Sequence, residues 1–180
     1  MIEVRGKRIS TLFSADQIAE RNLAMAGQMQ GKVHRDLLVI AILKGSFIFA
    51  ADLIRAMHQQ GIAPEVEFIT LSSYGKGTES TGVKILRDID SKVEGRDVLL
   101  IDDILESGNT LKFARDLMLE RGANNVEIAV LLDKHSRRKA SVDADYIGFE
   151  CPDHFVVGYG MDVAYAFREL SFVGVVEGDV

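Results

Sequence analysis

The order of hydrophobic and polar positions along the chain predicts strands that alternate with helices. Residues 37–43 form a continuous apolar run, which suits a strand buried on both faces, and residues 98–101 are predicted to be another buried strand. Residues 66–71 and 126–132 are two further predicted strands. Between them, apolar residues recur at helical spacing. These stripes are Phe47, Ala50, Ala51, Ile54 and Met57, followed by Gly61, and Leu111, Ala114, Leu117 and Met118, followed by Gly122. The alternation predicts an α/β fold, with a parallel-sheet core and helices on both faces.

The segments around this core have weaker patterns. Ser14 followed by Gln17 is a capping-box pattern, which predicts a helix from there to about residue 30. Shorter apolar segments are candidates for further strands; they are residues 4–12, 146–149, 155–157 and 172–176. Residues 72–90 are rich in glycine, hydroxyl and charged side chains, and we expect them to form a long mobile excursion from the core.

Composition and charge limit the class of protein. The 180 residues suit one α/β domain, and 47% of them are hydrophobic. The net charge of −6 disfavours general nucleic-acid binding, which usually needs a basic face. No apolar stretch approaches the roughly 18 residues of a membrane span, and the N-terminus lacks the apolar segment of a signal peptide. The single cysteine, Cys151, cannot form an intrachain disulfide. We therefore expect a cytoplasmic protein without nucleic-acid or membrane partners.

The most informative chemistry follows the apolar run at 98–101. Asp102 and Asp103 come directly after this run, at the carboxyl end of a predicted strand, where parallel sheets bind their ligands. Two adjacent carboxylates repel each other, which is easier to explain if they share cations or a diol. A small, hydroxyl-rich turn at 106–110 then opens a helix and offers backbone N–H groups to a phosphate. Together these features predict a site for a ribose phosphate. The four histidines show no zinc-enzyme spacing, and neither a Walker loop nor a dinucleotide fingerprint occurs.

This block resembles the phosphoribosyl pyrophosphate motif of the type I phosphoribosyltransferases. Other segments resemble the hypoxanthine-guanine branch of that family; they are residues 43–46, 72–75, 131–134, 146–150, 152–153 and 155–162. The resemblance implies one phosphoribosyltransferase domain over residues 1–180. It implies a core at about 14–145 and a small hood subdomain formed by the N-terminal segment and about 146–180.

The resemblance also implies an activity in purine salvage. It is the Mg²⁺-dependent transfer of the phosphoribosyl group from phosphoribosyl pyrophosphate to N9 of hypoxanthine or guanine, which gives IMP or GMP and pyrophosphate. A homodimer or homotetramer is implied as well. Xanthine-guanine transfer stays open, because xanthine differs only at C2. An RNA-binding regulator with the same phosphoribosyl motif is disfavoured by the acidic charge, and a catalytically silent binder is the remaining alternative.

The family's site residues carry over to positions in this sequence. The resemblance implies a phosphoribosyl pyrophosphate site made of Lys44, Gly45, Ser73, Tyr74, Asp102, Asp103, Glu106, Ser107, Gly108, Asn109, Thr110 and Arg168. It implies a purine site made of Lys134, Phe155, Val156 and Asp162, and metal ligands Asp102, Asp103 and Asp162.

Catalysis is assigned by the same resemblance to Glu106 and Lys134. Glu106 would accept the purine N7 proton, although the family usually has Asp there. Lys134 would donate to O6 of the purine, which selects against adenine because its 6-amino group also donates. Ser73 and Tyr74 would belong to a closing lid, and the Lys44–Gly45 peptide bond can be cis in this family. We expect Arg137, Arg138 and Lys139 to be solvated or to contact another subunit.

Overall fold

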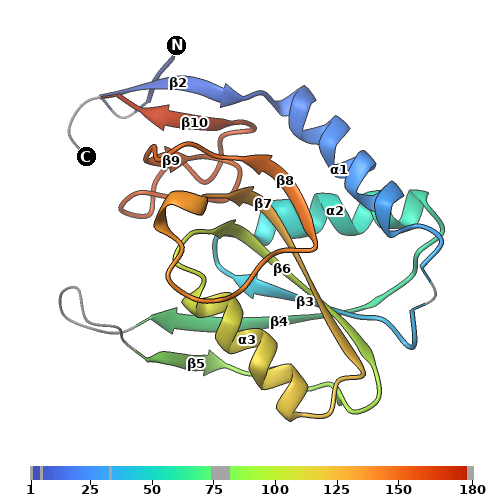
Figure 1. Ribbon diagram of the computed structural model, residues 1–180. Helices are drawn as coiled ribbons and strands as arrows, with labels where there is room; N and C mark the ends of the chain where they lie inside the picture. Colours follow the sequence, from blue (N-terminus) through green and yellow to red (C-terminus); the bar gives the residue numbers. More distant parts are fainter. Residues whose placement is uncertain (1, 5, 33, 74–81, 178–180) are drawn as a thin grey trace.

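The computed structural model of the chain describes residues 2–4, 6–32, 34–73 and 82–177. Its larger sheet has six strands in the order β5-β4-β3-β6-β7-β8 (Figure 1). All neighbours in this sheet are parallel except β5, which pairs antiparallel with β4. The strands are β3 (Leu38–Leu43), β4 (Glu65–Ser73), β5 (Val83–Arg87), β6 (Asp97–Leu105), β7 (Asn125–Asp133) and β8 (Tyr146–Glu150). The predicted α/β class with a largely parallel core is confirmed.

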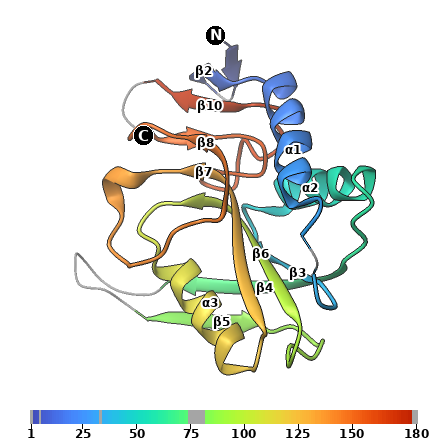
Figure 2. The ribbon, with the colours of Figure 1, turned by 45° about the vertical axis from the view of Figure 1, so that its right-hand side comes forward.

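Helices cover both faces of this sheet because its central strands are apolar on both sides. Along β3, Val39 and Ala41 pack with helices α1 (Ala15–Met29) and α2 (Phe47–Gln59). The alternate residues Leu38, Ile40 and Ile42 pack toward helix α3 (Asn109–Glu120) on the opposite face. Figure 2 shows α1 and α2 together on one side and α3 on the other. The capping box expected for the first helix is present: Ser14 Oγ accepts from Gln17 N, and Gln17 Oε1 accepts from Ser14 N.

A second, smaller antiparallel sheet brings the two ends of the chain together. Its order is β1-β2-β10-β9, with β1 (Ile2–Val4), β2 (Lys7–Phe13), β9 (Val156–Val157) and β10 (Val173–Val176). The ring of Phe13, at the end of β2, stacks on Phe149 of β8 with centroids 4.1 Å apart. Arg21 of α1 donates to the carbonyls of Ile147 and Gly148 in β8. These contacts fix the second sheet above the carboxyl ends of the main-sheet strands.

Two expectations about the strands are wrong. Residues 82–90 are not simply an excursion, because β5 (Val83–Arg87) returns to pair with β4, for instance Ser73 with Val83. β6 also does not end before the acids: it continues to Leu105, where Leu105 pairs with Asp133 of β7. The two acids interrupt the apolar pattern without ending the strand, since Ile104 packs against one core cluster and Leu105 is fully buried in the other. Among the described helices, none has both the length and the hydropathy to cross a bilayer.

The core around α2 provides a stability prediction. Leu53 is fully buried in the cluster between α2 and the sheet. Leu53→Ala should lower the free energy of unfolding by about 2–5 kcal/mol, because the lost methyl groups leave a cavity that close packing cannot refill. Urea denaturation measures the change. Leu119→Ala, at a 48% exposed position on α3, is the matched control and should change stability by less than about 0.5 kcal/mol. Equal effects at the two positions would contradict the assigned packing.

Candidate active site

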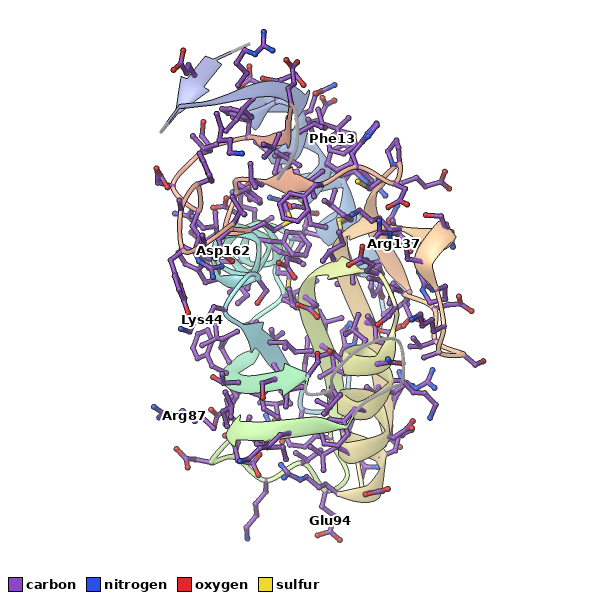
Figure 3. The ribbon with its side chains drawn as sticks, turned by 90° about the vertical axis from the view of Figure 1, so that its left-hand side faces the viewer. Phe13, Lys44, Arg87, Glu94, Arg137 and Asp162 are labelled. Carbon is purple, nitrogen blue, oxygen red and sulfur yellow. The ribbon has the colours of Figure 1, made fainter. Side chains whose placement is uncertain are left out.

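The site is built at the carboxyl ends of β3, β4, β6 and β7, under the second sheet. In Figure 3, Lys44 and Asp162 lie between the two sheets on one side and Arg137 lies at a similar level on the other. Lys44 follows β3 directly, whereas Asp162 comes from the loop between β9 and β10. In the same view Arg87 lies on the edge strand β5 and Glu94 lies at the bottom of the picture. The topology therefore brings together side chains that are more than 100 residues apart.

The acid pair lies inside the last turns of β6. Asp102 is buried and Asp103 is half-buried. Asp102 Oδ1 accepts from the backbone N–H of Asp103, and Asp103 Oδ1 accepts from that of Ile104, both at 2.9 Å. Burial raises the pKa of both carboxyl groups, and for Asp102 the neighbouring charge of Asp103 raises it further. A cation or a diol between them would relieve this unfavourable charge.

The turn after β6 has several backbone N–H groups without a protein acceptor within the described residues. Gly108 caps α3 with φ = +83°, a conformation that favours glycine. Within the described chain, the N–H groups of Ser107, Gly108, Thr110 and Leu111 donate to no protein acceptor. They are the free donors of a helix N-terminus, and the helix dipole adds a favourable potential for an anion. The turn can therefore hold a phosphate group.

Two adjoining cavities contain most of the predicted site residues. The smaller, about 260 Å³, is lined by Ser73, Asp102, Asp103, Glu106, Ser107, Gly108 and Thr110, among others. The larger, about 540 Å³, includes Lys44, Gly45, Asp103, Glu106, Lys134, Phe155, Val156, Asp162 and Arg168 in its lining. Asp103 and Glu106 line both cavities, so the two spaces meet at these carboxylates. Asn109 lines neither cavity, and Tyr74 lies outside the described residues.

Glu106 lies beside two cationic side chains at this junction. Its side chain is 39% exposed, and its Oε1 is 3.4 Å from Lys134 Nζ and 3.7 Å from Arg137 Nε. Lys134 is nearly buried, at the end of β7, where its backbone N–H donates to Leu105 O. Arg137 is also paired with Asp153 at 2.7 Å. A carboxylate, an ammonium group and the half-exposed ring of Phe155 thus line one cavity that is large enough for a purine.

The loop after β3 approaches the acids very closely. A Cβ built on Gly45 would lie 1.9 Å from Asp103 Oδ2, and a Cβ on Gly160 would lie 2.3 Å from Gly45 O. The cis peptide bond of this loop joins Leu43 to Lys44, not Lys44 to Gly45. Opposite the loop, Arg168 pairs with Asp162 at 2.7 Å and donates to Gly160 O at 2.6 Å.

One further residue of the site was missed by the sequence analysis. Arg138, expected to be solvated, has a side chain that is only 13% exposed and is paired with the buried Asp133. Its guanidinium also donates to Glu106 O and Val142 O. The sequence shows only a short basic run at this point, and that pattern does not distinguish a buried arginine from an exposed one.

A third cavity, about 630 Å³, lies between α1, α2 and residues 169–171. It contains the buried Asn22, whose Nδ2 donates to Tyr159 while its Oδ1 has no partner within the described residues. None of the predicted site residues lines this cavity. The candidate site is therefore the pair of cavities at the strand ends.

Comparisons with known proteins show the family to which the chain belongs. A model of the phosphoribosyl transferase domain matches residues 14–164. A hypoxanthine-guanine phosphoribosyltransferase of Aquifex aeolicus is 42% identical over 180 residues, which is 98% of this chain and 99% of that protein. A solved hypoxanthine phosphoribosyltransferase of Staphylococcus aureus is 41% identical, with a TM-score of 0.86 over 93% of this chain and 91% of the other. One from Trypanosoma cruzi is 34% identical, with a TM-score of 0.90 over 98% and 94%.

Proposed function

Since the chain belongs to the phosphoribosyltransferase family, we propose that it transfers the 5-phosphoribosyl group of phosphoribosyl pyrophosphate to N9 of hypoxanthine or guanine. The products are IMP or GMP and pyrophosphate, and the role is purine salvage. One observation supports this most directly: the cavity with free N–H donors and the cavity with Lys134 meet at Asp103 and Glu106. A ribose phosphate in the first places its C1 where a base in the second can attack it.

The carboxylates at the strand end suit Mg²⁺. No cluster of three or more potential metal-ligating residues forms within the described chain. Mg²⁺ commonly uses one or two carboxylates and completes its coordination with water and substrate phosphates. Asp102 and Asp103 fit this arrangement: burial raises the pKa of both carboxyl groups, and a bound cation would favour their charged forms. Asp162 is a further ligand on the pyrophosphate side. Bound Mg²⁺ supplies charge neutralisation for the departing pyrophosphate.

The phosphoribosyl group is held by backbone and carboxylate groups. The 5′-phosphate accepts from the N–H groups of the turn that contains Ser107, Gly108, Asn109 and Thr110, and Asp102 and Asp103 face the ribose diol. The pyrophosphate contacts the loop of Lys44 and Gly45 and the guanidinium of Arg168. Arg168 lines the larger cavity, and its guanidinium donates a hydrogen bond to Gly160 O. An arginine fork matches the geometry of phosphate oxygens.

The base is read by Lys134 and oriented by Phe155 and Val156. Lys134 donates to O6, Phe155 stacks on the ring, and Val156 contacts the base through its backbone. As the C1–oxygen bond breaks and the transition state becomes oxocarbenium-like, Glu106 accepts the N7 proton and increases the electron density available at N9. Ser73 and Tyr74 belong to a lid that excludes water from C1 during this step. We place the reaction in the cytoplasm and expect a homodimer or homotetramer.

The test is a transferase assay with four purines in parallel. With phosphoribosyl pyrophosphate and Mg²⁺, kcat/KM for hypoxanthine and guanine should exceed that for adenine by a factor of about 10³ or more. Adenine has an amino group in place of O6, so it offers no acceptor to Lys134. The buried ammonium group of Lys134 would then lose its hydrogen bond to the base. Xanthine in the same assay decides the xanthine-guanine alternative. Activity should disappear with a chelator and return with excess Mg²⁺.

The assay also has an outcome against the proposal. Folded protein that transfers to no purine, but binds RNA tightly, would favour a regulatory role. Orotate serves as the negative control because it is a pyrimidine acceptor of related transferases and lacks the purine contacts of Lys134 and Phe155.

A further inference from the structure

The buried pair formed by Asp133 and Arg138 lies behind the phosphate turn and takes no part in the proposed chemistry. Neither side chain lines either cavity of the site. The Asp133 side chain is 1% exposed, and it pairs with Arg138 and with His135 Nε2 at 3.0 Å. Burying such a pair is costly unless additional hydrogen bonds satisfy both groups. The other hydrogen bonds of the Arg138 guanidinium therefore indicate the structural role of the pair.

Those bonds go to backbone carbonyls of two loops, the turn after β6 and the segment between residues 138 and 145. Arg138 Nε donates to Glu106 O at 3.2 Å, and its Nη1 donates to Val142 O at 2.7 Å. The segment that follows continues the pattern, since the backbone N–H groups of residues 139 and 140 both donate to Ser107 O at 2.9 Å. The carbonyl side of the turn at 106–107 is thus tied to residues 138–142.

The N–H groups of the turn are free because helix α3 begins here: Gly108 is the N-cap, and its carbonyl accepts the first helical bond, from Lys112 N. The N–H groups before Lys112 have no intrahelical partner at a helix start. The bonds from residues 139 and 140 to Ser107 O and from Arg138 to Glu106 O hold the peptide groups that carry the first of these donors.

Side-chain packing against Gly108 also fixes the position of the turn. A Cβ built on Gly108 would lie 2.7 Å from Val142 Cγ1 and 3.1 Å from Arg138 Cδ. The turn therefore rests directly against the arginine stem. Asp133 is the last residue of β7, and Lys134 follows it directly. Asp133, which holds Arg138, is therefore the chain neighbour of Lys134, which faces the purine in the proposed function.

We propose that Arg138, held by Asp133, is a positioning residue for the 5′-phosphate: it anchors Glu106 O and holds the segment whose backbone binds Ser107 O, and so orients the free N–H groups of the turn toward the phosphate. The inference rests on the proposed function, since that function places the phosphate in this turn. Arg138 acts without touching the substrate. Its planar fork of five donors can bind Asp133, Glu106 O and Val142 O together, which the single ammonium group of lysine cannot do.

The test is Arg138→Lys, with Asp133→Asn as a second variant that retains the shape of the pair. In both, KM for phosphoribosyl pyrophosphate should rise about 10-fold or more, because a charge-assisted hydrogen bond contributes about that much. KM for hypoxanthine should change less than about 3-fold. Arg121→Lys is the matched control: it alters an arginine paired with Asp88 far from the site and should change neither constant.

A direct readout isolates the phosphate. Calorimetry with IMP and inosine gives the factor by which the phosphate tightens binding, and this factor should fall about 10-fold in Arg138→Lys while the dissociation constant of inosine stays the same. If both ligands weaken equally, or neither changes, Arg138 is a general structural residue and the inference fails. If wild-type protein binds IMP no more tightly than inosine, or transfers no purine, the proposed function itself fails, which is a different result.

Discussion

Glu106→Gln is expected to lower kcat for hypoxanthine by a factor of about 10²–10⁴, because the amide cannot accept the N7 proton as the bond to N9 forms. The substitution keeps the size of the side chain and leaves an oxygen acceptor for Lys134, whose Nζ lies 3.4 Å from Glu106 Oε1. KM for hypoxanthine should therefore change little. Steady-state kinetics at saturating phosphoribosyl pyrophosphate separate the two constants, and retention of IMP binding by calorimetry shows an intact site.

Glu106→Asp is the control for this prediction. It keeps the carboxylate and shortens the side chain by one methylene, about 1.5 Å, and Asp is the residue that the family usually carries here. We expect it to retain activity within about 10-fold of wild type, because the variant keeps a carboxylate base and carries the residue that is usual at this position. An active Gln variant would keep the enzyme but remove Glu106 as its base. An inactive Asp variant beside an active wild type would show that Arg137 and Lys134 are spaced for the longer acid.

Much of the site could be predicted because its chemistry is local in sequence. Asp102, Asp103 and the turn to Thr110 lie within nine residues, on one strand end and one helix start, and the apolar run before them marks the strand. Parallel topology then follows from the alternation of elements, and it places Lys44 and Lys134 at the same edge of the sheet. The structure shows these residues around the same pair of cavities.

The rest could not be predicted because it depends on contacts between distant segments. β5 is only five residues long and lies in a segment rich in charged and small polar residues, so its pairing with β4 is what defines it as a strand. β2 pairs with β10 across most of the chain, which no local pattern specifies. Arg138 has the same sequence signature as a solvated arginine, and its burial depends on Asp133 and on the carbonyls of another loop. Gly45 was predicted to belong to the site, but its close approach to Asp103 depends on how two distant segments pack.

Gly45→Ala is expected to lower kcat/KM by about 10²-fold or more while the protein stays folded. The added Cβ would lie 1.9 Å from Asp103 Oδ2 and 2.7 Å from its Cγ, so the Asp103 carboxylate has to move. A displacement of about 1 Å at a catalytic centre can cost two orders of magnitude. In the proposed site this carboxylate serves both the metal and the ribose, so the variant should also need more Mg²⁺ for half-maximal activity. Kinetics over a Mg²⁺ series measure both effects.

Gly27→Ala is the matched control, because it adds the same methyl group where nothing lies within 4 Å and the backbone is helical. It should leave kcat/KM unchanged and stabilise the protein by about 0.4–1 kcal/mol, since alanine loses less backbone freedom on folding. If Gly45→Ala lowers the melting temperature sharply, the close approach serves folding and the kinetic result carries no weight. If Gly45→Ala is as active as Gly27→Ala at every Mg²⁺ concentration, Asp103 does not need the position that the loop imposes, and its assignment as a metal ligand has to be abandoned.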